Sequence, residues 1–501
     1  MRILYIDIDS LRPDHLGCYG YARPTSPMMD TIAKESVRFT NFFASDSPCV
    51  PSRAALMSAR PGIQNGVVAH ENTPKGSTMR YGNAQRYGDA PFFMHHLLHA
   101  GMRTISFSSF ADRHYAGWFH FGFREFHLAS LKGGNEDAIE VNAAVLPWLE
   151  RFAGEDGWFL HLNYWDPHTL YTEPLEYMHK MAEHPAPAWP DAATIKAQQA
   201  LVGIRTPRTL WADNPHEGFG RSRVPTMPDR VGNRADFEHL VNGYDGAIRY
   251  LDEHLARVFD VLEAQGVLSE TAVIISADHG EAFGELGQYM EHGAATPATN
   301  RVPLIVRWPG VTDGAAGRVR DELLLNIDLA PTVSEALGLE PPAGWAGRSF
   351  LPLLKGGDLA QPRDHLVFSH GLHTRQRAVY DGRWLLVRSY HPSYYLYPPR
   401  MLFDLSADPY LTNDLAEGLP EQVAVMDALL VSWERENVAA TGLPDPMRDI
   451  QGEAPAIIGA PAAYLERLRG EGRERDADRL LEQWARLEAD YAPPPLDQAM
   501  D

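Results

Sequence analysis

The sequence has little of what stabilises a small secreted fold or holds a protein in a membrane. Only two of its 501 residues are cysteines, Cys18 and Cys49, which excludes a fold built on several disulfides but leaves room for one bridge. No run approaches the roughly 20 apolar residues that cross a bilayer, and no internal repeat is visible. The length fits one large domain with an appendage.

Positive charge is also scarce. The chain has 45 Lys and Arg against 66 Asp and Glu, a formal net charge of −21. This balance works against broad electrostatic capture of nucleic acid or of an anionic membrane, so we expect neither as a partner. Any anionic ligand must be attracted by a local cluster of positive groups.

The first residues leave no room for a signal peptide. Met1 and Arg2 run directly into an apolar strand pattern that ends in acids at Asp7 and Asp9. If Met1 is the native start, we expect a cytoplasmic protein, although a chain from which a leader had been removed would look the same.

Short apolar runs alternate with longer helical patterns along most of the chain. This alternation predicts an α/β fold, a mostly parallel sheet sandwiched by helices. The clearest strands span residues 3–9, 103–108, 158–164, 272–277 and 303–308. The helical patterns span residues 27–35, 51–58, 91–100, 137–152, 236–265 and 329–337.

The pattern changes after about residue 354. Four short strand patterns between residues 366 and 404, followed by a helix near 420–437, indicate a smaller C-terminal α+β subdomain. We therefore place a catalytic domain at residues 1–360, the subdomain at 361–450 and a helical extension at 451–501.

Two further segments have distinctive compositions. The charged extension has helical spacing and is a candidate contact for a homo-oligomer. Residues 183–233, rich in Pro, Gly and Arg, predict a long surface excursion of the kind that carries substrate contacts in α/β domains.

Acidic residues follow two of the predicted strands. Asp7 and Asp9 are two residues apart and share one face of the first strand, and Asp278 and His279 follow the strand at 272–277. Open α/β sheets bind ligands at the carboxyl ends of their strands. A lone acid there would more often cap the next segment, but two such strand ends predict a divalent-metal site.

Cys49 lies just ahead of a predicted helix. Pro51 suits the first turn of a helix, which places Cys49 near the helix N-terminus, where peptide dipoles favour an anion. A thiol there is expected to be reactive, with Arg53 one turn further along. An isolated cysteine is more often a small buried residue, so this position alone leaves both interpretations open.

Together these residues resemble the type I sulfatases of the alkaline phosphatase superfamily. The segment Cys49-x-Pro51-Ser52-Arg53 is similar to the signature in which that family's cysteine is oxidised to Cα-formylglycine. Further matching segments run in the family's order through residues 1–416, which makes the resemblance specific. They are residues 9–20, 158–168, 278–281, 301–304 and 405–415.

The resemblance implies an alkaline-phosphatase-like fold and a role for each matching residue. Cys49, as formylglycine hydrate, would be the nucleophile and also a metal ligand. Arg53 would help to fix the hydrate. The remaining metal ligands would be Asp9, Asp278 and His279.

Four residues are assigned to the substrate by the same resemblance. His168 aligns with a histidine that contacts the substrate sulfate. His292 falls where many members have a lysine that protonates the leaving oxygen. Arg113 and His114 lie near the position of a family Lys-x-His pair and are assigned to substrate binding by proximity.

Three positions depart from the family pattern. Ser10 stands where many members have a second acid, so one ligand is either missing or supplied by Asp7. Asp7 aligns with an apolar position, and we assign it to support of the site rather than to the metal. Ala59 replaces a glycine in the maturation signature.

The family's chemistry is the hydrolysis of sulfate monoesters. A bound dication lowers the pKa of the hydrate; after one hydroxyl takes the sulfuryl group, deprotonation of the other expels sulfate and restores the aldehyde. We expect a sulfuric ester hydrolase acting on a sulfated carbohydrate or another alkyl or aryl sulfate. The implied cofactors are formylglycine, made from Cys49 by a maturation enzyme, and a divalent metal, Ca²⁺ with Mn²⁺ or Zn²⁺ as alternatives.

Two other functions remain compatible with these residues. A phosphonate monoester or phosphodiester hydrolase would use the same nucleophile and metal. A non-catalytic protein on this scaffold would bind a sulfated glycan without cleaving it, although retention of the complete set of metal-site residues argues against that.

Overall fold

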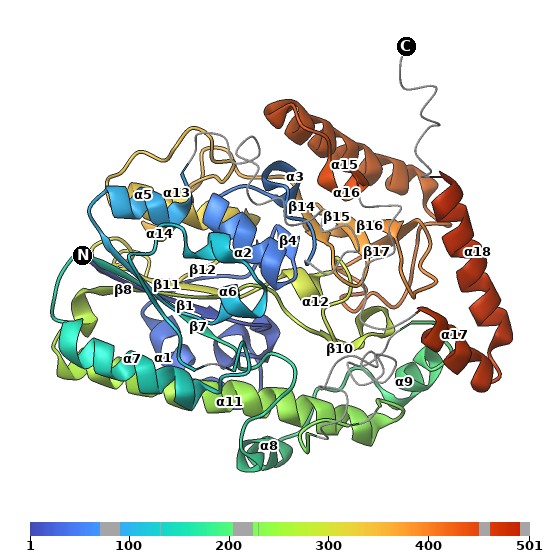
Figure 1. The fold of residues 1–501 in the computed structure, drawn as a ribbon, viewed down its shortest axis with the longest axis horizontal. Coiled ribbons are helices and arrows are strands. Elements are labelled where there is room, and N and C mark those ends of the chain that lie inside the picture. The colour runs from blue at the N-terminus through green and yellow to red at the C-terminus, as the bar shows by residue number, and fades with distance from the viewer. Residues whose placement is uncertain (71–90, 131, 204–223, 229, 450–460, 491–501) are drawn as a thin grey trace.

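A computed structural model describes residues 1–70, 91–130, 132–203, 224–228, 230–449 and 461–490. Its centre is an eight-stranded sheet in which β1 is flanked by strands on both sides (Figure 1). β1 is apolar and buried along almost its whole length, as a strand covered on both faces must be. The order is β12 (Val319–Arg320), β2 (Val37–Phe39), β11 (Leu304–Arg307), β8 (Thr271–Ala277), β1 (Arg2–Ile8), β7 (Trp158–Tyr164), β5 (Arg103–Phe107) and β6 (Glu125–His127).

The sheet is mostly parallel, as the sequence predicts. β1 pairs in parallel with both β7 and β8, and the parallel order continues through β5 and β6. β11 instead runs antiparallel to β8 and β2. The chain reaches β11 from the carboxyl end of β8 through short elements, without a helix that crosses back along the sheet, so the strand returns in the opposite direction.

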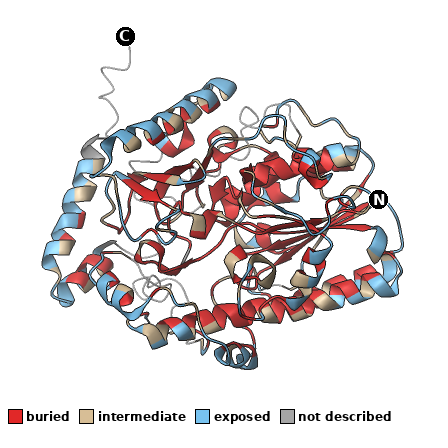
Figure 2. Cartoon of the chain, turned by 180° about the vertical axis from the view of Figure 1, so that it is seen from behind, coloured by how far each residue is buried: buried red, intermediate tan, exposed pale blue. Residues whose placement is uncertain are grey.

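Helices cover both faces of this sheet, and their inner surfaces are buried (Figures 1 and 2). One face carries α1 (Pro27–Lys34), α7 (Ala138–Phe152) and the long α11 (Arg234–Ala264), against which α8 (Leu175–Ala182) packs. The opposite face carries α2 (Cys49–Ser58), α5 (Phe93–His99), α13 (Leu329–Ala336) and α14 (Leu351–Leu354).

A second, five-stranded sheet lies beside the first. β14 to β17 form an antiparallel meander, and α15 packs on it. The fifth strand is β4, which comes from the N-terminal part of the chain and pairs in parallel with β14. This pairing joins the second sheet to the segment directly before Cys49. The elements are β4 (Asp46–Ser47), β14 (Leu366–His370), β15 (Arg375–Tyr380), β16 (Trp384–His391), β17 (Arg400–Asp404) and α15 (Pro420–Thr441).

The C-terminal arm, α17 (Pro461–Gly470) and α18 (Glu474–Asp490), folds back onto the loop between β16 and β17. Trp484 Nε1 donates to the Ser393 carbonyl at 2.8 Å, and its ring contacts that of Tyr394. No helix in the described part of the chain is both long and apolar enough to span a membrane. The remaining elements are β3 (Phe42–Phe43), β9 (Ala282–Phe283), β10 (Tyr289–Glu291), β13 (Leu324–Leu325), α3 (Gly62–Asn65), α6 (Phe110–Arg113), α9 (Ala192–Gln198), α12 (Pro297–Asn300) and α16 (Pro446–Asp449).

The strands and helices predicted above are all present, with ends shifted by a few residues. The sequence did not predict the short strands β2, β3, β4, β9 and β10. In the expected excursion at residues 183–233, the structure shows α9, while residues 204–223 and 229 lie outside the described residues.

A buried ion cluster ties α15 to the second sheet. Arg377 on β15, fully buried, donates to Glu434 at 3.0 Å and to Asp445 at 2.5 and 2.6 Å. We expect Arg377→Ala to destabilise the protein by about 3–5 kcal/mol, because the buried Asp445 loses both hydrogen bonds to its cation and Glu434 loses the buried one of its three arginine partners. Arg400→Ala, which breaks a half-exposed pair with Asp427, should cost less than about 1 kcal/mol. Urea unfolding of both variants checks this, and equal midpoints would contradict it.

Candidate active site

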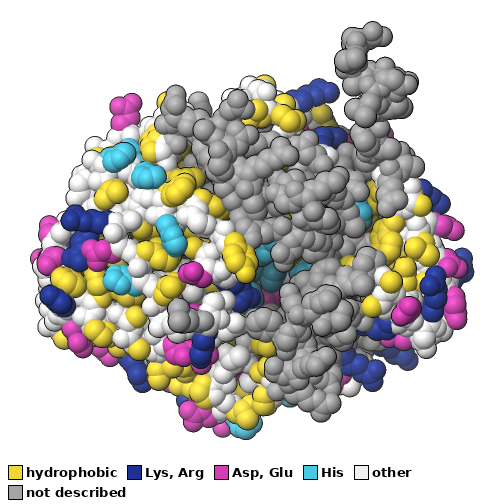
Figure 3. All heavy atoms as spheres, viewed as in Figure 1, with side chains coloured by type: hydrophobic (Ala, Val, Ile, Leu, Met, Phe, Trp, Pro, Cys, Tyr) yellow, Lys and Arg dark blue, Asp and Glu magenta, His cyan; other side chains and the backbone are white. Residues whose placement is uncertain are grey.

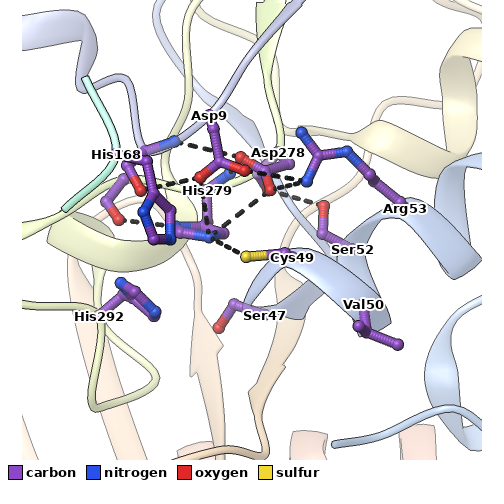
Figure 4. A network of polar contacts seen from close by, with 12 residues as sticks. Asp9, Ser47, Cys49, Val50, Ser52, Arg53, His168, Asp278, His279 and His292 are labelled. Atoms are coloured by element: carbon purple, nitrogen blue, oxygen red, sulfur yellow. Dashed lines mark hydrogen bonds and ion pairs between the residues drawn. The ribbon is translucent and has the colours of Figure 1, made fainter. Parts of the chain in front are cut away.

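The sheet brings the predicted metal residues together at its carboxyl edge. Ile8 lies opposite Ala277 in the β1–β8 register, so Asp9 and Asp278 leave neighbouring strands side by side. α2 begins at Cys49 and points its N-terminus at the same place (Figure 4). One donor atom from each of Asp9, Cys49, Asp278 and His279 lies within 4.8 Å of all the others, and all four residues are buried.

His279 is oriented as a metal ligand. Its Nδ1 donates to the Gly280 carbonyl at 2.9 Å, so the lone pair of the neutral ring is on Nε2. Nε2 lies 3.1 Å from Cys49 Sγ, 3.7 Å from Asp9 Oδ1 and 3.5 Å from Asp278 Oδ2. A carbonyl that fixes the other ring nitrogen is the usual support of a metal-binding histidine. Two carboxylates, one imidazole and the residue at position 49 therefore form a donor set that fits a divalent cation.

Arg53 locks α2 against these acids. Its Nη1 donates to Asp9 at 3.2 Å and also to Asp278, and its Nε donates to Asp7 at 3.0 Å. In addition, Ser52 Oγ donates to the Asp278 carbonyl at 2.6 Å. Residues 52 and 53 of the predicted signature thus hold the helix in place, and they thereby fix the position of Cys49 one turn earlier.

The electrostatics of the acids are asymmetric. Burial, together with the charges of Asp9 and Asp7, raises the pKa of Asp278 well above its usual value. Burial also opposes ionisation of Asp9, but His168, Arg53 and His279 outweigh it and lower the pKa of this carboxyl. The site therefore holds more negative charge than its arginine neutralises, which favours uptake of a cation.

The structure corrects the expectation of a reactive thiol at Cys49. Burial, followed by the charges of Asp9 and Asp278, raises the pKa of the thiol well above its usual value. These effects outweigh the favourable dipole of α2. In the absence of a cation, these effects disfavour the thiolate form of an unmodified Cys49.

His168 and His292 lie next to the cluster, on the side of His279 (Figure 4). Their ring centroids are 6.0 Å apart, and that of His292 is 4.5 Å from that of His279. His292 Nδ1 donates to the buried Glu281 at 3.3 Å. Burial lowers the pKa of His168 to about 4, although Asp9 opposes this. Glu281, which the sequence did not single out as a partner of His292, lies in the segment 278–281.

Arg113 and His114, assigned from proximity alone, lie beside the same cluster. Arg113 stacks its guanidinium 4.9 Å from the centre of the Trp165 ring and donates to the Gly134 carbonyl. Its charge favours the ionised forms of Asp9 and Cys49, although burial and the two acids still keep the pKa of the thiol raised. Burial, then His70 and Arg113, lowers the pKa of His114 well below its usual value.

Three more histidines, which the sequence did not indicate, lie around this cluster. His70 accepts from the Val50 amide at 3.4 Å and contacts the His114 ring. His370, at the end of β14, bonds to Ser47 Oγ at 3.0 Å, and His373 bridges His370 and His292 with ring distances of 6.2 and 5.8 Å. Histidine side chains reach the surface near the centre of the face that Figure 3 shows. The only sequence signal for His370 and His373 was their spacing of three residues. The pairing of β14 with β4 brings them close to Cys49.

Comparison with known proteins places these features in a family. A sulfatase family model matches residues 2–339, and a model described as N-sulphoglucosamine sulphohydrolase, C-terminal, matches residues 285–432. The chain is 25% identical to iduronate 2-sulfatase of Mus musculus over 454 residues, which cover 78% of each chain.

Solved structures share the fold at lower identity. One, in complex with its substrate D-glucosamine-2-N,6-O-disulfate, has a TM-score of 0.68 and 19% identity and covers 89% of this chain and 99% of its own. Phosphonate monoester hydrolase of Agrobacterium radiobacter has a TM-score of 0.67 and 21% identity, with 87% and 96% covered. The sulfatase model alone spans well over half of the sequence, so the resemblance seen in the sequence is confirmed and the chain belongs to the sulfatase family.

Proposed function

We propose that this protein hydrolyses a sulfate monoester, with the formylglycine hydrate derived from Cys49 as nucleophile. One observation carries the proposal: Cys49 lies at the N-terminus of α2, inside a buried group that also contains Asp9, Asp278 and His279. An alternative use of the same scaffold for phosphonate monoesters fits less well, because the family model and the curated relative are sulfatases.

The metal would be held by Asp9, Asp278, His279 and the modified residue 49. When bound, a dication lowers the pKa of a hydroxyl at residue 49 and offsets negative charge on the sulfuryl oxygens. The oxygen-rich donor set favours Ca²⁺, and the single imidazole leaves Mn²⁺ and Zn²⁺ as alternatives. Conversion of Cys49 would require a formylglycine-generating or equivalent enzyme, because burial and the charges of Asp9 and Asp278 disfavour the thiolate despite Arg53 and Arg113.

The remaining residues bind the anion and protonate the leaving group. The amide groups at the start of α2 and the guanidinium groups of Arg53 and Arg113 favour an anion in a chain of net charge −21. His168 faces the same space. His292 is positioned to donate a proton to the leaving oxygen, because Glu281 holds its Nδ1 and stabilises the imidazolium form.

The substrate class we propose is a sulfated carbohydrate. The curated relative is named for iduronate 2-sulfate chemistry, and the solved structure with a bound substrate holds a disulfated glucosamine. A sugar alkoxide is a poor leaving group, so an acid such as His292 has a clear role in this chemistry.

Kinetics on matured protein tests the reaction. We expect kcat/KM for 4-nitrophenyl sulfate to exceed that for a phenylphosphonate monoester, and Cys49→Ala to reduce turnover to background without loss of fold. The mass of the tryptic peptide 39–53 must show the aldehyde in the wild-type protein. A preference for the phosphonate, or wild-type-like turnover by Cys49→Ala, would contradict the proposal.

Loss of one carboxylate ligand tests the metal site. We expect Asp278→Asn to weaken metal binding by more than about 10-fold, because even groups outside the ligand set commonly contribute about 10–100-fold. Asp364→Asn is the control, since that side chain is 91% exposed. Calorimetric titration of chelator-treated protein measures both, and unchanged binding by Asp278→Asn would count against this ligand set.

Replacement of His292 separates acid catalysis from binding. His292→Ala should lower kcat/KM for a sugar sulfate by about 10²–10⁴-fold, the usual contribution of a positioned acid. For 4-nitrophenyl sulfate, whose phenoxide leaves without a proton, the loss should be far smaller. His99→Ala, on the exposed side of α5, is the matched control. Equal losses on both substrates would assign His292 to binding alone.

A further inference from the structure

Asp7 is a buried acid that touches the site without belonging to the ligand set. It lies on β1, two residues before Asp9, and is 1% exposed. Its Oδ2 accepts from Arg53 Nε at 3.0 Å and from His161 Nε2 at 3.2 Å. Arg53 therefore stands between Asp7 and the pair of Asp9 and Asp278.

A chain of hydrogen bonds through His161 and Ser106 fixes the position of Asp7. His161, on β7, meets Ser106 Oγ, on β5, at 2.8 Å through its Nδ1. Because Nε2 donates to a carboxylate, the neutral ring accepts the Ser106 hydroxyl proton at Nδ1. All three side chains are buried, so three adjacent strands, β1, β7 and β5, fix the position of one carboxylate.

Each side-chain nitrogen of Arg53 has a hydrogen-bond partner. Nε meets Asp7, and Nη1 meets Asp9 and Asp278. In the amide orientation that satisfies both groups, Asn163 accepts from Nη2 at 3.1 Å and donates to Ser108 at 2.9 Å.

The charges in this cluster do not cancel. Three carboxylates share one guanidinium in a buried region. Metal binding requires ionised ligands, and with all three carboxylates ionised two negative charges remain, which one divalent cation would balance. Asp7 Oδ1 is buried and has no hydrogen-bond partner among the described residues. A structural role alone would not require a third acid, because the oxygen of a neutral amide at position 7 could also accept hydrogen bonds from Arg53 and His161.

We propose that Asp7 is a positioning residue that sets the charge of the metal centre: it shares the Arg53 guanidinium with the ligands Asp9 and Asp278, so that these two are only partly neutralised, and it adds the negative charge that matches a dication. This inference rests on the metal site of the proposed function. Without Asp7, Arg53 would bind the other two carboxylates more strongly and compete with the metal for them.

An isosteric variant gives a result with a defined sign. In Asp7→Asn, we expect the Kd for Ca²⁺ or Mn²⁺ to rise by about 10–100-fold, the usual effect of a supporting carboxylate. Burial opposes ionisation of Asp7, but Arg53 and His161 outweigh it and lower the pKa, so loss of this charge should lower the Tm of the metal-free variant. A merely structural role predicts the same lower Tm with an unchanged Kd, so the Kd decides between the two.

Charge relocation makes the test specific. Asn163 contacts Arg53 from another side, so Asn163→Asp adds a carboxylate next to the guanidinium with little change in shape. Alone, it should tighten metal binding and lower the Tm of metal-free protein. Combined with Asp7→Asn, it should restore a Kd near that of wild type. Asp46→Asn is the matched control, because Asp46 is equally buried, also has an unpartnered oxygen among the described residues and does not bond to Arg53.

The measurements are calorimetric titration with CaCl₂ or MnCl₂ and thermal unfolding with and without metal. Wild-type Kd in Asp7→Asn, or a double variant that fails to recover, would overturn the role of Asp7 and leave the metal site standing. Absence of saturable metal binding by wild type would overturn the metal site itself and this inference with it.

Discussion

The site depends on one buried guanidinium that is shared by three carboxylates. A buried charge without partners costs several kcal/mol, so Arg53 can be buried only where acids from β1 and β8 converge on it. The same contacts fix α2, because Arg53 and Ser52 anchor its first turn to the end of β8. The position of residue 49, and hence of the nucleophile, follows from this ion cluster rather than from the helix itself.

The acidic chain nevertheless provides a place for an anion. Arg113, the start of α2 and a group of histidines lie around the acids Asp9 and Asp278. The histidines are buried and close together, and burial lowers the pKa of His70, His114 and His370 by disfavouring their charged forms. An anion next to such a histidine favours its protonated form, which offsets part of this effect.

The sequence predicted the parts of the site that follow strand ends and helix starts. Asp9, Asp278 and His279 could be placed because parallel strands end at one edge, and Cys49 because Pro51 marks a helix start. The sequence could not reveal that the pKa of the Cys49 thiol is raised, since that depends on burial and on acids distant along the chain. It also missed the use of Asp7, whose partners His161 and Ser106 lie on strands that become neighbours only in the folded sheet. Glu281 was visible in its motif, but its bond to His292 spans a hairpin whose strands are too short to recognise.

The second sheet also contributes to the site, again through contacts between segments that are distant along the chain. β4 is only two residues long, and no sequence pattern would identify it as a strand. Yet its pairing with β14, together with the bond between Ser47 and His370, carries the C-terminal part of the chain to the residues before Cys49. His373 follows on the same segment and reaches His292. Two acids of the cluster follow strands of the first sheet, while His370 ends a strand of the second and His373 comes shortly after it. The two-residue pairing of β4 with β14 therefore determines which side chains from the C-terminal part of the chain lie beside His292 and Ser47.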